Sequence, residues 1–149
     1  MSSFTDQINA FLVKAENQAD DIVSTAVLDL QQQLSDATPV DTGKAKSNWL
    51  VEIDQCSGKT VTDTSNKNLA EAKELLSSTR QSRRRPKYYS LFNNLEYIRV
   101  LEYGLYPNPP KKVTGKTVNG YSTQAPQGFF RLTVAGWQQT LQQAAKAKR

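Results

Sequence analysis

The chain has 149 residues, 19 Lys and Arg against 14 Asp and Glu, one cysteine and no histidine. Its length favours one domain, and its composition excludes internal disulfides, cysteine-based zinc sites and every catalytic mechanism that uses histidine. The sequence has no run of about 18 apolar residues, so we expect no membrane span. Residues 1–21 lack the basic and apolar pattern of a secretory signal, so we expect none.

The net charge of +5 is distributed unevenly along the chain. Residues 1–42 hold one basic and seven acidic side chains, whereas residues 43–149 hold 18 basic and seven acidic ones. This asymmetry is typical of a protein with two functional faces, which would serve self-assembly or place a basic face near nucleic acid. Unevenly distributed surface charge with no such role explains it equally well.

A single amphipathic helix is predicted over residues 1–36, because apolar residues recur there at steps of three and four. Ser3 or Thr5 can cap its start, and Pro39 prevents its continuation. At about 1.5 Å per residue such a helix is about 50 Å long. That is long for a chain of this size, so we expect part of the apolar stripe to pack on the domain and part on a neighbour.

Residues 44–104 should form strands with a polar helix between them. Alternating apolar residues predict a strand over 47–55, and 59–64 is expected to pair with it as a hairpin. A narrow apolar stripe predicts a polar helix over 66–81, and an aromatic run predicts a strand over 88–93. A short helix over 94–103 should then end at Gly104, with four residues turned inward: Tyr97, Ile98, Leu101 and Tyr103.

The last third of the chain is predicted to be a loop followed by a helix. Residues 105–128 are rich in proline and glycine, which predicts a long mobile loop. Residues 129–147 should form a C-terminal helix whose apolar face holds Phe130, Val134, Trp137, Leu141 and Ala145. These elements predict an α+β fold in one domain, residues 1–149. The long N-terminal helix and the C-terminal helix would pack on a small antiparallel β-sheet.

Two groups of basic residues are candidates for contact with a partner or with DNA. The first is Arg83, Arg84, Arg85 and Lys87, which precede two tyrosines and could neutralise phosphates or form salt bridges with a partner. The second group lies in the predicted loop: Lys111, Lys112 and Lys116. A GKT triplet at 115–117 lacks the earlier glycine of a phosphate-binding loop, because position 110 is proline, so no nucleotide site is predicted.

No catalytic residue, metal site or cofactor is predicted. Four carboxylates, Glu52, Asp54, Glu96 and Glu102, are interpreted as surface charges, because nothing else marks a general acid–base pair. A carboxylate–metal nuclease that uses Glu52 or Asp54 is a distant alternative. Cys56 is interpreted as an inert thiol.

Three segments, in order, resemble those of a known family. TPVDTGK followed by SNW, over residues 38–49, looks like a "PVDTG-basic…SW" signature. Residues 93–104 are similar to "NNxPYAxxxEYG", although Leu95-Glu96 replaces the usual proline-centred step, and QAPQGFFR over residues 124–131 resembles "QAPxGmvR". Together they resemble the neck or tail-completion proteins (minor-tail-protein-Z-like) of long-tailed bacteriophages. The matched positions are Pro39, Asp41, Thr42, Gly43, Trp49, Tyr97, Glu102, Gly104, Pro126, Gly128 and Arg131.

The resemblance implies a structural virion protein at the head–tail joint, assembled in the host cytoplasm, with no enzymatic activity. It implies a homo-oligomeric ring, commonly six-fold, that contacts the head connector or stopper, the tail terminator or tail tube, and packaged DNA without reading its bases. Local chemistry suggests that the matched positions determine the fold, with caps at Asp41 and Thr42, a turn at Gly43 and a helix start at Pro126. Two alternatives are kept: a tail terminator or stopper, and a free-standing non-specific DNA-binding protein.

Overall fold

The computed structural model describes residues 3–105, 115 and 117–148 of the chain. It contains a long helix, α1 (Phe4–Ala37), and two C-terminal helices, α5 (Phe130–Ala135) and α6 (Trp137–Ala147). The elements between them are α2 (Lys44–Ser47), β1 (Leu50–Ile53), α3 (Asn68–Gln81), β2 (Tyr89–Phe92), α4 (Ile98–Tyr103), β3 (Thr117–Val118) and β4 (Tyr121–Ser122).

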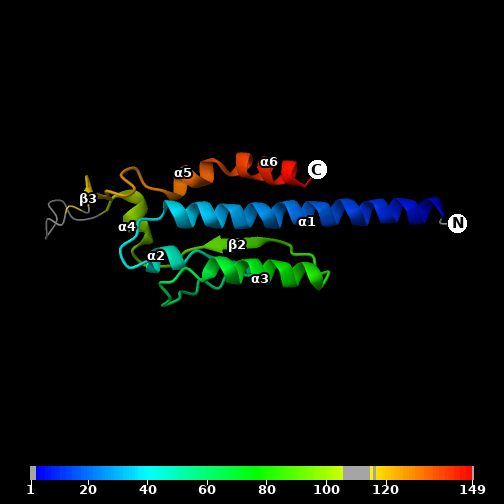
Figure 1. Cartoon of the computed structure of the whole chain (residues 1–149), viewed down its shortest axis with the longest axis horizontal. Helices are drawn as coiled ribbons and strands as arrows, with labels where there is room; N and C mark the ends of the chain where they lie inside the picture. The colour runs from blue at the N-terminus through cyan, green and yellow to red at the C-terminus, as the bar shows by residue number, and fades with distance from the viewer. Residues whose placement is uncertain (1–2, 106–114, 116, 149) are drawn as a thin grey trace.

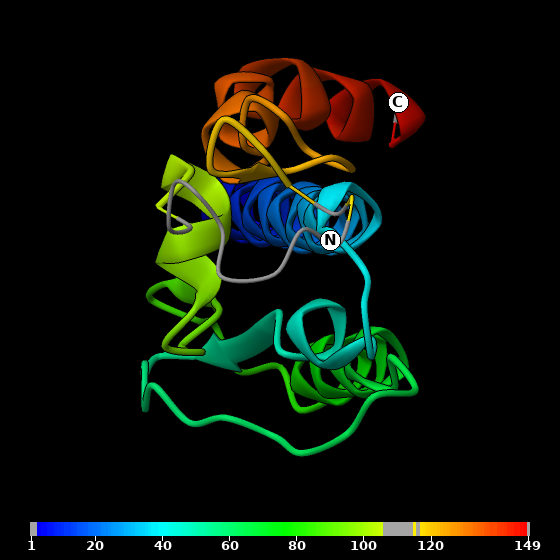
Figure 2. The same ribbon diagram turned by 90° about the vertical axis from the view of Figure 1, so that its left-hand side faces the viewer.

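Helix α1 is the middle layer of the molecule. Helices α5 and α6 lie along one side of it, while β1, β2, α2 and α3 lie on the other side (Figure 1, Figure 2). The predicted α+β class is confirmed, with a long N-terminal helix, C-terminal helices and small antiparallel sheets. None of the helices in the described ranges is long and apolar enough to cross a lipid bilayer.

Ser3, one of the two predicted caps, begins α1 in a capping box with Asp6. The backbone N–H of Asp6 donates to the Ser3 hydroxyl at 3.1 Å, and the Ser3 N–H donates to the Asp6 carboxylate at 3.0 Å. At the other end the Thr38 N–H donates to the Leu34 carbonyl, and Pro39 follows. The helix therefore ends one residue later than predicted.

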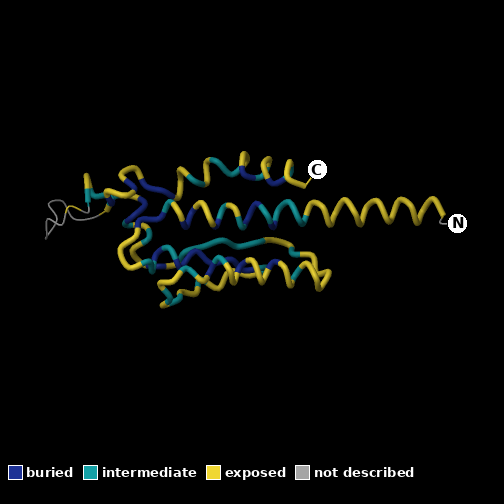
Figure 3. The backbone as a smooth tube through the Cα atoms, viewed as in Figure 1, coloured by how far each residue is buried: buried dark blue, intermediate teal, exposed yellow. Residues whose placement is uncertain are grey.

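The two halves of α1 differ in their environment. Every described residue from 3 to 19 is exposed, whereas burial begins at 20 and continues to the C-terminal end (Figure 3). Helix α6 runs along the buried half in the opposite direction, since Gln33 donates to the Thr140 hydroxyl at 3.1 Å and Gln18 to the Lys148 carbonyl at 3.5 Å. From Gln18 toward the N-terminus of α1, no element of the described chain covers the helix.

Strands β1 and β2 pair in antiparallel register, from Leu50 opposite Phe92 to Ile53 opposite Tyr89. The hairpin predicted between β1 and residues 59–64 is wrong, because that segment contains no strand. The Asn48 side chain accepts from the Val61 N–H at 2.8 Å and donates to the Val61 carbonyl at 2.9 Å. These side-chain bonds take the place of a strand ladder. The predicted strand also begins late, because Ser47 belongs to α2.

The core consists of two clusters of buried side chains. One lies around the end of α1 and contains Leu34, Ala45, Trp49, Leu95, Leu101, Ala125 and Phe129. The other joins α1, β1 and α3 through Val27, Val51 and Ala72. Strand β1 is buried on both faces, so the alternating sequence does not mark an exposed face here.

Several predicted elements need correction in the second half of the chain. The short helix begins at Ile98, and Tyr97 and Tyr103 are 39% and 45% exposed instead of turned inward. The predicted loop contains a hairpin, in which Thr117 pairs with Ser122 and Val118 with Tyr121. Asn119 and Gly120 form the turn of this hairpin, and both have a positive φ. Residues 106–114 and 116 lie outside the described part of the chain.

The predicted C-terminal helix is two helices, α5 and α6, separated at Gly136. The predicted apolar face is also displaced, because Thr140 and Ala144 are buried while Leu141 and Ala145 are only half-buried. Helix α6 packs mainly on α1 and not on the sheet. The buried face of α6 includes Thr140 because α1 offers a polar partner there: the Gln33 amide of α1 donates a hydrogen bond to the Thr140 hydroxyl.

Candidate functional site

The three segments that carry the family resemblance meet at the end of the molecule where α1 ends. They are residues 38–49, 93–104 and 124–131, and each contributes buried side chains to the same core cluster. Specific side-chain contacts join them in pairs. This junction is the candidate functional site.

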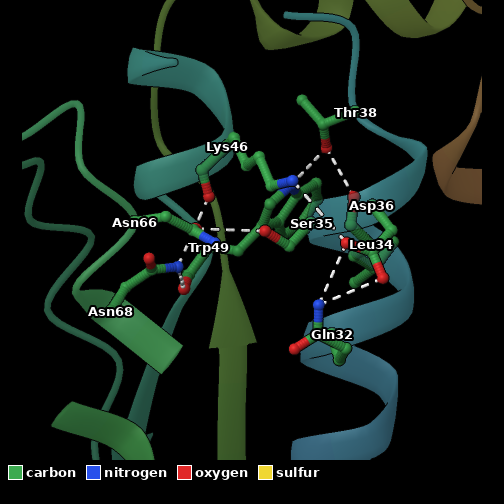
Figure 4. A network of polar contacts seen from close by, with 9 residues as sticks. All are labelled: Gln32, Leu34, Ser35, Asp36, Thr38, Lys46, Trp49, Asn66 and Asn68. Atoms are coloured by element: carbon green, nitrogen blue, oxygen red, sulfur yellow. Dashed lines mark hydrogen bonds and ion pairs between the residues drawn. The ribbon is translucent and has the colours of Figure 1, made fainter. Parts of the chain in front are cut away.

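Trp49 links the first segment to the third. Its ring is 3% exposed, stacks on Phe130 with centroids 5.8 Å apart, and meets Phe129 edge-on at 6.4 Å. Its indole N–H donates to the Thr38 hydroxyl at 2.7 Å, which itself donates to the Leu34 carbonyl (Figure 4). The buried indole nitrogen is therefore satisfied, and the tryptophan is held in one orientation.

Two buried amides reach the backbone of Trp49 from other elements. Gln31 of α1 donates to the Trp49 carbonyl at 2.9 Å. Asn68 of α3 donates to the same carbonyl at 2.7 Å and also to the Lys46 carbonyl (Figure 4). Neither amide was predicted from the sequence to have a role. The available signal was spacing, because Gln31 follows the buried Val27 by four residues and so shares its helix face.

A second link joins the first and third segments through an amide and a backbone. Gln124 accepts from the Val40 N–H at 2.9 Å and donates to the Val40 carbonyl at 2.8 Å. The Gln124 amide thus bonds both backbone groups of Val40, as one residue of an antiparallel strand pair bonds the residue opposite it. It fixes the chain that leaves α1 against the chain that enters α5.

Glu102 joins the second segment to the third. Its carboxylate accepts from the N–H groups of Phe129, Phe130 and Arg131 at 2.8, 2.8 and 3.0 Å, and from the Arg131 side-chain Nε at 2.8 Å. Helix α5 has no side-chain cap of its own, so Glu102 satisfies the free N–H groups at its start. The interpretation of Glu102 as a surface charge is wrong, because it is only 4% exposed.

The electrostatics of Glu102 follow from these contacts. Burial by itself would raise the pKa of this carboxyl, but the three backbone N–H groups and Arg131 hold its pKa below the ordinary value. The Arg131 guanidinium also lies over the Tyr103 ring, 4.6 Å from its centroid, and its pKa is raised by the bond to Glu102.

Two glycines allow this close approach. Gly128 has φ +82°, and a Cβ atom there would lie 2.6 Å from the Glu102 carbonyl oxygen. Gly104 has φ +64°, and a Cβ atom there would collide with the Tyr121 ring. Both positions therefore require glycine for conformation and for space.

The other matched positions have mixed outcomes. Pro39 is buried, and the Thr42 hydroxyl accepts from the Lys44 N–H at 3.3 Å. The cap of α2 is Gly43 at φ +88°, without a side-chain bond, and Asp41 is exposed. Pro126 does not start a helix, because α5 begins four residues later at Phe130. Tyr97 is the N-cap residue of α4.

The basic run 83–87 lies apart from this junction, at the other end of α3. Arg84 pairs with Asp54 at 3.0 Å and Arg85 pairs with Glu16 of α1. Together with Arg83 they line a groove of about 590 Å³ whose lining also includes the acidic Asp20 and Asp21. Two of the four predicted contacts are therefore partly neutralised by the same chain. Lys111, Lys112 and Lys116 lie outside the described residues.

The remaining carboxylates do not form a catalytic constellation in the described residues. Glu52 is 4% exposed and accepts from the Ser57 hydroxyl and N–H at 2.6 and 2.7 Å, which lower its pKa. The interpretation of Glu52 as a surface charge is therefore wrong, because its side chain is buried. Asp54 accepts from the Tyr88 N–H and from Arg84. No group of three His, Cys, Asp or Glu able to hold a metal ion occurs in the described ranges.

Comparison with family models, curated proteins and solved structures gives no match for this chain.

Proposed function

We propose that this chain is a structural protein of the joint between the head and the tail of a long-tailed bacteriophage. It forms a homo-oligomeric ring, with six copies as the working number, that binds the head connector or stopper and the tail terminator or tail tube. It performs no catalysis and needs no cofactor. It belongs to the virion and is assembled in the host cytoplasm.

One observation carries the proposal. The three segments that resemble the neck and tail-completion family are distant in sequence, yet they form one junction in which Trp49, Glu102 and Gln124 join them. If each of the three segments resembled the family only by chance, there would be no reason for side chains of one segment to bond the other two. The resemblance therefore follows the residues that determine this fold.

The exposed half of α1 adds support. A monomer gains nothing from a helix that extends about 25 Å beyond its own packed body with apolar side chains in solvent. A subunit that must contact neighbours on more than one side has a use for such an element. This is the property required of a ring placed between two other assemblies.

The basic run is assigned the lesser role of contact with a partner or with packaged DNA. Arg83 and Lys87 have no ion pair among the described contacts, whereas Arg84 and Arg85 are paired with acidic residues of the same chain. A chain specialised for free DNA binding would leave such a run unpaired. A free-standing DNA-binding protein is therefore the weaker candidate.

The experiment is electron microscopy of a lysate in which this gene carries a stop codon. The proposal predicts separate DNA-filled heads and finished tails. Tails of uncontrolled length would instead identify a tail terminator. Normal joined particles would contradict the proposal and would redirect attention to DNA binding by the basic run.

A further inference from the structure

The basic run, residues 83–87, forms the loop between α3 and β2. It holds four of the 19 basic side chains of the chain, all of them exposed, and residues 82–88 include no acidic side chain. Arg83 has a backbone φ of +55°, a left-handed conformation that arginine rarely adopts. An arginine held in such a conformation favours a role for its charge.

Two arginines of the run are paired with carboxylates from elsewhere in the chain. Arg85 pairs with Glu16 of α1, and Arg84 pairs at 3.0 Å with Asp54, which directly follows β1. The side chains of Arg85 and Arg84 remain 45% and 61% exposed, so both pairs are open to solvent. Such pairs are weak, because water and salt screen them. A phosphate can therefore replace the carboxylate.

Helix α1 adds negative charge to the same place. Glu16 and Asp20 are four residues apart and share one helix face. Asp20 and Asp21 line the groove of about 590 Å³ together with the arginines of the run. Asp21 pairs with Arg80 of α3 at 2.8 Å, whereas Asp20 has no ion pair among the described residues. Asp20 therefore lowers the positive potential of the groove without being bound to one arginine.

The surroundings of the run fit a phosphate backbone better than a protein surface. An interface between proteins has an apolar core, but Tyr88 is the only large exposed apolar side chain in residues 82–88. Duplex DNA needs no such core, because its phosphates bind lysine and arginine through charge, and its affinity follows the number of phosphates neutralised. The partner that fits this loop is therefore the backbone of duplex DNA.

We propose that Glu16 and Asp20 of α1 suppress the affinity of the basic run for duplex DNA. In the free chain Arg85 is bound to Glu16, and the charge of Asp20 repels phosphates. The run therefore holds DNA through fewer contacts than its composition allows. Contact with DNA stays weak and reversible, which lets the duplex slide along this surface instead of being held.

The suppression rests on the DNA contact of the proposed function, but it is measured on the purified chain alone. It can therefore fail while the stop-codon lysate still contains separate heads and tails. The reverse also holds, because joined particles in that lysate would leave the DNA affinity of the purified chain unchanged.

The test is fluorescence anisotropy of a labelled duplex of about 20 base pairs, titrated with the purified full-length chain at about 0.1 M NaCl. The test variant combines Glu16→Gln and Asp20→Asn. The matched control combines Asp29→Asn and Glu71→Gln, which remove the same charge from exposed positions of α1 and α3 that do not line the groove. Circular dichroism should show both variants folded.

We expect the test variant to bind the duplex about tenfold more tightly than the wild type, because one additional phosphate contact contributes about that factor at this salt concentration. A plot of log affinity against log NaCl concentration should steepen by about one unit. The control should change the affinity by less than about threefold, since charge removed far from the run acts only through screened solvent. Adding Arg85→Ala to the test variant should restore the wild-type affinity and slope, because Arg85 is the cation that loss of Glu16 releases.

Several results would overturn the inference. An equal gain in the test and control variants would mean that only net charge matters. A gain that persists after Arg85→Ala would mean that DNA binds elsewhere on the chain. A test variant that binds no more tightly than the wild type, or no binding by any of the proteins, would direct the basic run to an acidic protein partner instead.

Discussion

At the residue scale, the position that most requires explanation is Glu102. A buried carboxylate is costly unless it is paired and hydrogen-bonded, and this one accepts four hydrogen bonds from the start of α5. It therefore acts as a cap supplied by a distant segment. Its partners explain why glutamate, glycine and arginine occur together in the second and third resemblance segments.

Replacing Glu102 with glutamine should destabilise the fold by about 2 kcal/mol at neutral pH. Glutamine keeps one acceptor oxygen but directs an NH2 group at backbone donors and loses the charge that Arg131 contacts. Urea unfolding at pH 7 would show a lower midpoint with an unchanged slope. A midpoint equal to that of the wild type would contradict this role.

The contribution of Glu102 should depend on pH in a definite direction. Its pKa is lowered in the folded state, so its stabilising effect is full above the ordinary pKa and disappears as the pH falls through the folded value. The stability difference between wild type and Glu102→Gln should therefore narrow between pH 7 and about pH 3. A difference that stays constant over this interval would show that shape, and not charge, matters at this position.

The close approach at Gly128 gives a second prediction at this scale. Gly128→Ala should cost about 3 kcal/mol, because it adds a collision with Glu102 to the strain of a positive φ. Gly115→Ala is the matched control, since Gly115 has φ +68° with no atom within 4 Å of the added Cβ. The control should lose only about 1 kcal/mol. Equal losses in denaturant unfolding would exclude the collision.

At the element scale, α1 combines two functions in one helix. Residues 20–37 pack against α3, α5 and α6, whereas every residue from 3 to 19 is exposed. A chain that lacks residues 1–12 should therefore unfold within about 3 °C of the full chain, a shift of about 1 kcal/mol. Thermal unfolding at low protein concentration measures this. A decrease of more than about 8 °C would mean that the exposed half supports the body.

The sequence predicted the helices better than the strands, for a physical reason. Helix α1 and its Ser3 cap follow from local spacing and capping chemistry, and α3 and β2 were found within two residues. The partner of β1 could not be predicted, because pairing depends on distant contacts. The Asn48 side chain forms hydrogen bonds with the backbone N–H and carbonyl of Val61. Residues 59–64, the segment nearest to β1 in sequence, therefore do not pair with β1.

The candidate site was predictable in its members but not in its contacts. The resemblance marked Trp49, Glu102 and Arg131, yet Glu102 was interpreted as a surface charge because no local signal reveals a carboxylate that caps a helix 28 residues later. The division of the C-terminal helix at Gly136 was missed for the opposite reason. A glycine within an amphipathic pattern is often tolerated, so nothing in the sequence divides the helix at Gly136, where α5 ends and α6 begins.

At the scale of the whole molecule, the uneven charge of the sequence is partly resolved within one chain. The acidic α1 pairs with basic residues that come later, through Asp21 with Arg80 and Glu16 with Arg85. Exposed pairs of this kind add little stability. They do reduce the charge that a neighbour in the proposed ring would have to balance, which favours apolar contact as the basis of that proposed assembly.

Assembly of the purified chain should consequently resist salt. Raising NaCl from about 0.05 M to about 0.5 M screens exposed charges but leaves contact between apolar side chains intact. Sedimentation at both concentrations should give the same oligomer. Dissociation at the higher concentration would instead show that contacts between the acidic first third and the basic remainder hold the copies together.

If this chain joins heads to tails as proposed, the purified protein should restore joining where the protein is missing. Purified wild-type chain would be added to a lysate made with the stop-codon gene, and infectious particles would be counted. Infectivity should rise with added wild-type protein, and it should not rise with a variant that carries Phe4→Ser and Phe11→Ser in the exposed half of α1. Failure of the wild-type protein to produce joined, infectious particles from heads and tails in that lysate would contradict the claim.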